Sequence, residues 1–210
     1  MIVNMFISRF FRVYSSFIII FFKVWNMIYF TASGVKYGKR LRVYNKVYLT
    51  GDGNITIGDD FSFTSGSSLN PISRNIRGAL FTMSPKAEII IGNRVGISSA
   101  CIWAKERITI GNDVNIGGDC LILDNDAHPH EYLKRRRIYA KDVGYEAYLD
   151  EIPTAPVTID DDVWIGARCL ILKGVHIGAR SVLAAGSVVT KNIPADVVAC
   201  GNPCKVIKSL

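Results

Sequence analysis

The chain has 210 residues, of which 49% are hydrophobic, so it can bury a core, and disorder throughout its length is excluded. The net charge is +7, and eight of the 25 basic residues precede the first acidic residue, Asp52, which leaves the remainder nearly neutral. This basic beginning favours an anionic partner, or else it forms a solvated arm.

The first element is a hydrophobic segment over residues 5–30, which we predict to be a helix within an N-terminal unit of residues 1–40. Its broad apolar face needs a partner, which is either a lipid surface in whose plane the helix lies, the rest of the domain, or a sister subunit. The longest uncharged run, residues 13–22, is too short to span a bilayer, and a secretory signal is disfavoured because Lys23 and Asn26 interrupt the apolar run. On a helix, one narrow polar stripe would hold Arg9, Arg12, Ser16, Lys23 and Asn26.

A repeat of six residues dominates the rest of the chain. Large aliphatic residues recur at this interval at Ile159, Ile165, Ile171, Ile177, Leu183 and Val189. The pattern also covers Ile91, Ile97 and Trp103, resumes after a slip of one residue at Ile110, Ile116 and Ile122, and has a weaker early copy at Ile57, Phe63 and Leu69. The period fits short strands, three to a coil, that each direct one aliphatic side chain inward, with glycine permitting the tight corners. We therefore predict a parallel β-helix over residues 41–210 rather than an antiparallel β-sandwich, whose turns are spaced irregularly.

The five cysteines do not form a recognisable metal or redox motif. Cys200 and Cys204 are four residues apart, which suits neither a zinc knuckle nor a redox pair. Cys101, Cys120 and Cys169 fall four residues after an aliphatic position, where the repeat takes a small buried side chain. We expect them to fill the core in a reducing compartment.

Three stretches in the C-terminal third carry a family resemblance: VWIGA at 163–167, AAGSVVTK at 184–191 and GNPCKVI at 201–207. Together with the repeat over residues 50–208, they resemble the hexapeptide-repeat acyltransferases, in the branch of maltose, galactoside and nodulation-factor O-acetyltransferases. The resemblance implies a left-handed parallel β-helix with a C-terminal tail (194–210). It also implies a homotrimer whose active sites are shared between subunits, and acetyl-CoA as the acetyl donor.

The repeat stops after Ile122 and resumes at Ile159, so residues 124–156 must loop outward, and long loops on rigid scaffolds commonly carry function. The loop begins with the sequence DNDAHPH at 124–130. An imidazole suits the removal of a hydroxyl proton near neutral pH. The resemblance implies that His128 is this general base, with His130 as the alternative. Asp126 or Asp124 would then orient the ring, or would instead cap a turn.

The resemblance also implies a set of contacts to acetyl-CoA, at Trp164, Ala167, Ala185, Thr190, Lys191, Lys205 and Lys208. The acceptor-binding residues of the galactoside enzymes have no counterpart in the stretch 98–103, and the insertion in this chain is longer than theirs. Basic and aromatic loop residues, including Arg135, Arg136 and Tyr139, would suit a larger glycan or a diphosphate-linked lipid precursor.

These features predict an acetyl-CoA-dependent O-acetyltransferase that modifies a sugar hydroxyl during surface polysaccharide biosynthesis, with neither a metal nor a nucleic-acid partner. We expect it in the cytoplasm, with residues 5–30 providing peripheral contact to the inner face of the membrane. The only three histidines are His128, His130 and His176, and the last lies in the regular repeat, which disfavours a zinc site. A G-x-S-x-G elbow is absent from the sequence. The alternatives are a xenobiotic or amino-sugar acetyltransferase and a non-catalytic β-helix scaffold.

Overall fold

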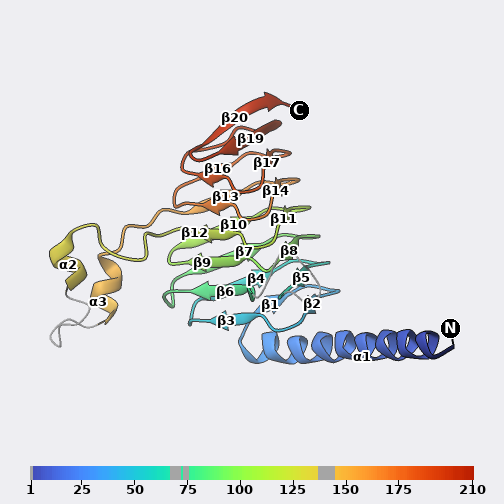
Figure 1. Cartoon of the computed structure of the whole chain (residues 1–210). Helices are drawn as coiled ribbons and strands as arrows, with labels where there is room; N and C mark the ends of the chain where they lie inside the picture. Colours follow the sequence, from blue (N-terminus) through green and yellow to red (C-terminus); the bar gives the residue numbers. More distant parts are fainter. Residues whose placement is uncertain (1, 67–71, 73–75, 137–144) are drawn as a thin grey trace.

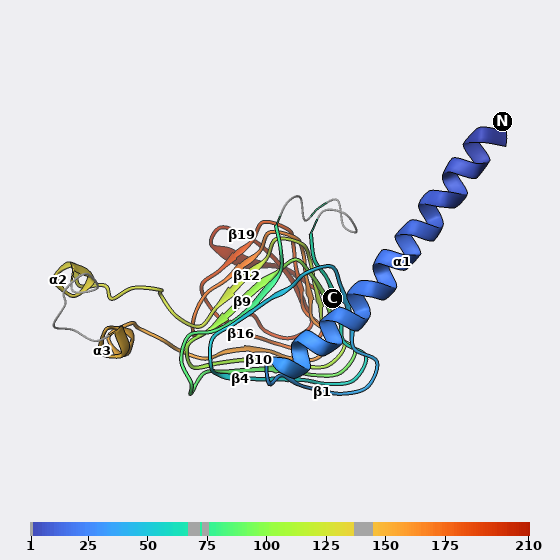
Figure 2. The same ribbon diagram turned by 90° about the horizontal axis from the view of Figure 1, so that it is seen from below.

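The computed structural model describes residues 2–66, 72, 76–136 and 145–210. They form a column of stacked coils, with one long helix, α1 (Ile2–Ala32), lying across its N-terminal end (Figure 1). Seen along its axis, the column has a triangular outline, and α1 crosses the triangle and projects well beyond it (Figure 2). The expected positions Leu69 and Tyr139 lie outside the described residues.

Three sheets form the sides of the column, and each complete coil contributes one strand to each sheet; the strands run parallel except the last, which pairs antiparallel with the strand before it. Sheet A contains β1 (Lys36–Tyr37), β4 (Asn54–Ile57), β7 (Glu88–Ile91), β10 (Arg107–Ile110), β13 (Val157–Ile159) and β16 (His176–Ile177). Sheet B contains β2 (Arg42–Tyr44), β5 (Ser62–Thr64), β8 (Gly96–Ser98), β11 (Asn115–Ile116), β14 (Trp164–Ile165), β17 (Val182–Leu183), β19 (Val197–Gly201) and β20 (Cys204–Ser209). Sheet C contains β3 (Tyr48–Thr50), β6 (Ala79–Thr82), β9 (Cys101–Ala104), β12 (Leu121–Leu123), β15 (Leu170–Ile171) and β18 (Val188–Val189).

The register stacks like residues into buried columns, as the period of six predicts. In sheet A the paired positions are Ile57, Ile91, Ile110, Ile159 and Ile177, and all of them are buried. Burying an isoleucine side chain stabilises a fold by about 1.5–3 kcal/mol, and a single coil has no other surface against which to bury it. The stability of the column therefore comes from the interfaces between coils.

The slip in the repeat lies earlier than the sequence pattern indicated. Ala100 and Ile102 point into the core, whereas Cys101 and Trp103 are only partly buried and alternate with them along β9. From Ile97 to Ile102, the next large aliphatic residue of the column, the chain thus takes five residues instead of six. The expected inward positions of Trp103 and Cys101 are wrong, because a strand alternates its faces and a one-residue slip exchanges them.

Two boundaries also differ from the expectation. The first sheet strand begins at Lys36, within the N-terminal unit predicted to extend to residue 40. In the second coil, the strand of sheet C that follows Phe63 contributes Leu80, which pairs with Leu49 and Ile102, in the place where the period predicted Leu69. Residues between β5 and β6 therefore form an insertion that the six-residue spacing did not reveal.

Glycine is required at several corners because adjacent coils pack closely there. A Cβ atom on Gly166 would come within 2.6 Å of the Ala185 nitrogen, and one on Gly117 within 2.5 Å of the Ala167 nitrogen. Neither glycine adopts the left-handed backbone conformation, so the need is for space rather than for conformational freedom.

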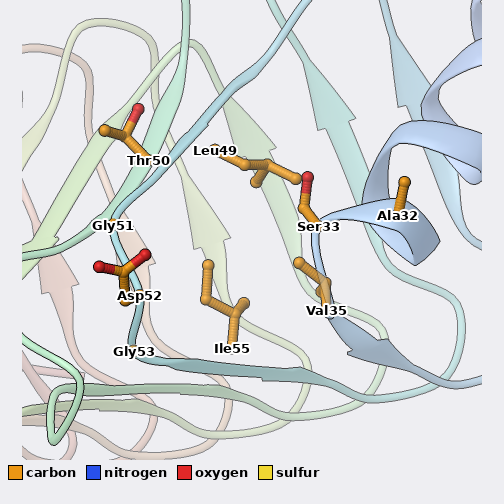
Figure 3. A pocket seen from close by; sticks show the side chains of 9 residues that line it. All are labelled: Ala32, Ser33, Val35, Leu49, Thr50, Gly51, Asp52, Gly53 and Ile55. Carbon is orange, nitrogen blue, oxygen red and sulfur yellow. The ribbon is translucent and has the colours of Figure 1, made fainter.

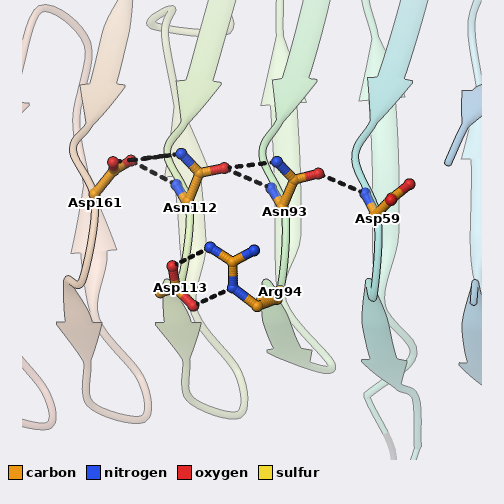
Figure 4. A network of polar contacts seen from close by, with 6 residues as sticks. All are labelled: Asp59, Asn93, Arg94, Asn112, Asp113 and Asp161. Carbon is orange, nitrogen blue, oxygen red and sulfur yellow. Dashed lines mark hydrogen bonds and ion pairs between the residues drawn. The ribbon is translucent and has the colours of Figure 1, made fainter. Parts of the chain in front are cut away.

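A polar ladder ties successive coils together at the corner between sheets A and B (Figure 4). The Asn93 side-chain oxygen accepts from the Asp59 amide at 2.8 Å, that of Asn112 from the Asn93 amide at 2.9 Å, and that of Asp161 from the Asn112 amide at 2.6 Å. The backbone amides at this corner have no partner in a sheet, and these side chains supply their hydrogen-bond acceptors.

Beside the ladder, the Arg94 guanidinium binds the Asp113 carboxylate and holds the pKa of that carboxyl below its usual range. Because the folded-state pKa is lowered, the pair stabilises the fold at neutral pH. This contribution is lost as the pH falls through the lowered value.

Candidate active site

The insertion leaves the column at the corner between β12 and β13, and its two ends are pinned side by side. The Asp124 carbonyl accepts from the Thr154 hydroxyl at 2.7 Å and from the Ala155 amide at 2.9 Å, and Asn125 forms an antiparallel bridge with Thr154. The loop carries α2 (Tyr132–Arg136) and α3 (Tyr145–Asp150), which stand out from one side of the column (Figure 1).

The Asp124 side chain holds the base of this loop. It is fully buried, and its two oxygens accept from the backbone amides of Lys105, Glu106 and Arg107, each at 2.7 Å. Of the two roles that the sequence left open for Asp124, the structure thus places it at the turn between β9 and β10, in the neighbouring coil.

The His128 ring is held by a residue on α3. Its Nδ1 lies 2.7 Å from the hydroxyl of Tyr148, which is 3% exposed, while the His128 side chain itself is exposed. Tyr148 packs with Leu149 and Ile152 in a small apolar cluster against Met83 of the column. When Nδ1 carries its proton and donates to the tyrosine, the second nitrogen, Nε2, has a free lone pair that can accept a proton.

The second histidine of the loop has a different partner. His130 Nε2 lies 2.6 Å from a carboxylate oxygen of Asp126, and Lys173 Nζ lies 2.7 Å from the same oxygen. Asp126 therefore pairs with His130 and Lys173, while His128 pairs with Tyr148. The expectation that Asp126 orients the His128 ring has no support in these contacts.

Arg135 and Arg136, expected on the acceptor side, make contacts inside the loop. The Arg135 guanidinium donates to the carbonyls of Pro129, at 3.0 Å, and of His130. The Arg136 guanidinium lies 5.3 Å from the centre of the Tyr132 ring. Arg135 thereby fixes the backbone that follows His128.

The residues expected to contact acetyl-CoA are spread over sheet B and the two corners at the ends of sheet C. Ala167 and Ala185 stack at the corner between sheets B and C, where the Gly186 amide donates to the Ala167 carbonyl at 2.9 Å. Trp164, on β14, is 58% exposed in sheet B. Lys205 and Lys208 lie exposed on β20, which pairs antiparallel with β19 at the edge of the same sheet.

Thr190 and Lys191 follow β18 and lie at the corner between sheets C and A. The loop with His128 leaves from that same corner, after β12, and β12 is separated from β18 in sheet C by β15 alone. Within one chain, Thr190 and Lys191 thus lie at the corner that carries the His128 loop, whereas Ala167 and Ala185 lie at the other end of the sheet C strands.

Two surface hollows lie away from the His128 corner. One, of about 280 Å³, lies beneath the end of α1 between Ser33, Asp52 and their neighbours (Figure 3). The other, of about 260 Å³, lies on sheet B against Trp164 and is lined by hydroxyl and amide side chains, among them Ser62, Ser98 and Asn115.

Two of the cysteines occupy core positions of the column. Cys120 and Cys169 are buried at the expected inward positions, and a hydrogen bond with Cys169 together with burial raises the pKa of the Cys120 thiol. His176 is exposed as expected and pairs with Asp160 at 2.8 Å. No group of three His, Cys, Asp or Glu side chains within the described ranges could hold a metal ion.

Sequence reasoning did not identify Tyr148 as the partner of His128. A hydrogen bond between side chains 20 residues apart leaves no spacing signal, and only the folding of α3 onto Met83 brings the two groups together.

Residues 156–191 match the family model described as the hexapeptide repeat of succinyl-transferase. The chain is 39% identical over 117 residues to the galactoside O-acetyltransferase of Escherichia coli, covering 51% of each protein. It is 53% identical over 60 residues to the 2,3,4,5-tetrahydropyridine-2,6-dicarboxylate N-acetyltransferase of Staphylococcus aureus, which is 28% of this chain and 25% of that protein. The resemblance found in the sequence is therefore confirmed, although the chain spans about half or less of the length of these relatives.

Two solved structures resemble the fold. A galactoside acetyltransferase in complex with coenzyme A has a TM-score of 0.51 and 27% identity, covering 83% of this chain and 64% of that one. AntD, an N-acyltransferase from Bacillus cereus, has a TM-score of 0.64 at 18% identity, covering 87% of both chains, and supports the fold alone.

Proposed function

We propose that this hexapeptide-repeat chain is an acetyl-CoA-dependent O-acetyltransferase that modifies a sugar hydroxyl, with His128 as the general base. The observation that carries the proposal is the exposed imidazole on the pinned loop, held through Nδ1 so that Nε2 faces away from its anchor. The kinship with the galactoside O-acetyltransferase of Escherichia coli supports both the donor and the class of acceptor.

The chemistry needs one proton transfer and one displacement. His128 Nε2 takes the proton of the acceptor hydroxyl as its oxygen attacks the thioester carbonyl carbon. Collapse of the tetrahedral intermediate forms the ester and breaks the carbon–sulfur bond. The imidazolium then returns the proton to the departing thiolate. A backbone amide of a neighbouring coil would stabilise the oxyanion.

The proposal is tested by incubating the full chain with acetyl-CoA carrying a labelled acetyl group and a panel of acceptors: free galactosides and maltose, larger glycans, diphosphate-linked lipid precursors and amino sugars. Transfer to a hydroxyl of a sugar in the panel is the expected result. Hydrolysis of acetyl-CoA without transfer, or exclusive labelling of an amine, would contradict the proposal.

Tyr148 is proposed to be a positioning residue for His128. Tyr148→Phe removes the hydroxyl with little change in packing, and the loss of one neutral hydrogen bond of about 0.5–1.5 kcal/mol predicts a roughly 3- to 10-fold lower kcat. The KM for acetyl-CoA should stay unchanged, because Tyr148 is not among the expected donor contacts and its hydroxyl bonds to His128. Steady-state kinetics would check this split, and a change in KM alone would contradict the positioning role.

Lys205 and Lys208 are proposed to bind the phosphates of the donor as point charges. Replacing both with alanine should raise the KM for acetyl-CoA roughly 3- to 10-fold, the size expected for exposed ionic contacts, and kcat should hold. Wild-type KM should rise with salt, and that of the double variant should rise less. Lys39 and Lys46, exposed at the far end of the column, provide a matched control. If the Lys205 and Lys208 variant and the Lys39 and Lys46 variant had equal KM values, the assignment of Lys205 and Lys208 to the donor phosphates would be contradicted.

We propose that the coils wind left-handedly and that three chains associate so that each active site is shared. Within one chain, Trp164 and Ala167 lie away from the corner that carries His128. A second chain can bring its own Trp164 and Ala167 against the His128 of the first, which supports a shared site. The handedness is supported by the resemblance to the hexapeptide-repeat acyltransferases. Light scattering on the full chain would measure the number of subunits.

The acceptor is proposed to be a glycan component of a surface polysaccharide. The hollow beside Trp164 supports a sugar, because an exposed indole face with hydroxyl and amide groups suits the apolar and polar edges of a pyranose ring. We further propose that the chain works in the cytoplasm at the inner face of the membrane, which α1 would contact. Arg135, Arg136 and Tyr139 remain the proposed contacts to the more distant part of the acceptor.

A further inference from the structure

The helix α1 is fixed to the column by its polar side. The Asn26 side-chain amide is buried and donates to the carbonyls of Val43, at 3.0 Å, and of Asn45, at 2.8 Å. One turn later, Phe30 is fully buried in the core, and the neighbouring Tyr29 hydroxyl lies 3.2 Å from the Leu49 carbonyl oxygen. These contacts determine which face of the helix points away from the protein.

The outward face of α1 is apolar. Phe17, Phe21, Val24 and Ile28 follow one another at helical spacing and are 52–68% exposed, and Trp25 stacks on Phe21 with ring centres 6.3 Å apart. A helix at a water-facing surface has the opposite arrangement, with its apolar stripe on the core and its polar residues outward. A contiguous exposed apolar face of this kind marks an interaction surface.

The charge around this face favours anionic lipid over a second copy of the chain. The first 51 residues contain eight basic side chains and not one carboxylate. Lys36, Lys39, Arg42 and Lys46 are exposed in the coil against which α1 packs. Two copies joined through α1 would bring like charges together, whereas anionic headgroups would neutralise them.

The contact would be made in the plane of the membrane. Within the described residues, no helix combines the length and the hydropathy that crossing a bilayer requires. An interfacial helix needs only one apolar face and cations at headgroup depth.

We propose that the face of α1 formed by Phe17, Ile20, Phe21, Val24, Trp25 and Ile28 docks on a membrane containing anionic lipids. Because α1 lies across the N-terminal end of the column, docking puts that end at the membrane, with the coils stacked away from it and the His128 loop projecting sideways (Figures 1 and 2). The docking surface is independent of the proposed acetyl transfer.

The experiment is co-sedimentation of the full chain with vesicles of phosphatidylcholine alone and of phosphatidylcholine with phosphatidylglycerol at 3:1. The chain should bind the anionic vesicles at least tenfold more strongly, and less so in high salt. The triple variant Phe17→Ser, Phe21→Ser and Ile28→Ser should lose at least tenfold in binding while its thermal unfolding is unchanged, because these side chains do not contact the core. Val206→Ser with Ile207→Ser, also exposed but on β20, is the matched control and should bind as the wild type does.

A second readout is independent of the variants' folding. Brominated lipids should quench the fluorescence of Trp25, and this quenching should disappear in Trp25→Phe. Equal binding of the wild type and the triple variant, or an absence of quenching, would overturn the proposal. Light scattering could also show that the triple variant forms smaller assemblies than the wild type while its vesicle binding is unchanged. That result would overturn the proposal as well, since the face would then join copies of the chain.

Discussion

Replacing His128 with alanine should lower kcat for acetyl transfer by about 10²–10⁴-fold, the usual contribution of a positioned general base. The KM for acetyl-CoA should change little, because the general base acts on the acceptor proton and His128 is not among the proposed donor contacts. The fold should survive, since the ring is exposed and its hydrogen bond is to a loop residue. Steady-state transfer of labelled acetyl groups to the best acceptor measures the loss, and circular dichroism checks the fold.

His130→Ala is the matched control for this variant. Both histidines lie on the same turn and both are exposed, but His130 binds Asp126 through Nε2. Its replacement should reduce kcat by less than about threefold, in keeping with an exposed ionic contact. If His130→Ala lost activity and His128→Ala kept it, the base would be His130, oriented by Asp126.

Replacing Asp124 with alanine should destabilise the chain by about 3 kcal/mol or more. The substitution removes a buried carboxylate that accepts from the amides of Lys105, Glu106 and Arg107, and a hydrogen bond to a charged group contributes about 1.5–3 kcal/mol. It also loosens the base of the loop, so activity should fall even where the variant is folded. Urea unfolding followed by circular dichroism measures the change in free energy.

Asp161→Ala provides the comparison for Asp124→Ala. Asp161 makes the same kind of bond, accepting from the Asn112 amide at 2.6 Å, but it is exposed at the end of the polar ladder. Water replaces an exposed acceptor, so the loss should be about 1 kcal/mol. Equal losses in the two variants would contradict the importance assigned to the buried carboxylate.

The column could be predicted because its physics is periodic. The inward positions from Ile159 to Val189 repeat with the strand pairing that stacks them, and all of them are buried. The loop over residues 124–156 followed from the interruption of that period. The slip near Ala100 was misplaced and the insertion before Leu80 was missed, because several nearby residues were apolar enough to continue the count.

The candidate site was predicted less completely. The motif around His128 pointed to the imidazole, but Tyr148, which holds it, is brought there by the packing of α3. Asp124 and Asp126 could not be told apart by sequence, since a carboxylate that caps a turn and one that pairs with an imidazole have the same local pattern. Their contacts differ because Asp124 is buried in the column and Asp126 lies beside Lys173.

The orientation of α1 on the column could not be predicted from the sequence either. The stripe containing Lys23 and Asn26 was found, but an isolated helix with such a stripe would be expected to turn it toward water. The structure turns Asn26 inward instead, because the carbonyls of Val43 and Asn45 need donors at the open end of the column. The apolar face then remains outside.

The most direct test of the account is a structure of the full chain crystallised with CoA. The thiol should lie within about 6 Å of a His128 Nε2. One acceptor hydroxyl then fits between them, hydrogen-bonded to Nε2 and close enough to attack the thioester carbon. The Trp164 and Ala167 corner around that thiol should belong to a neighbouring chain. A thiol bound far from every His128 ring would contradict the proposed reaction.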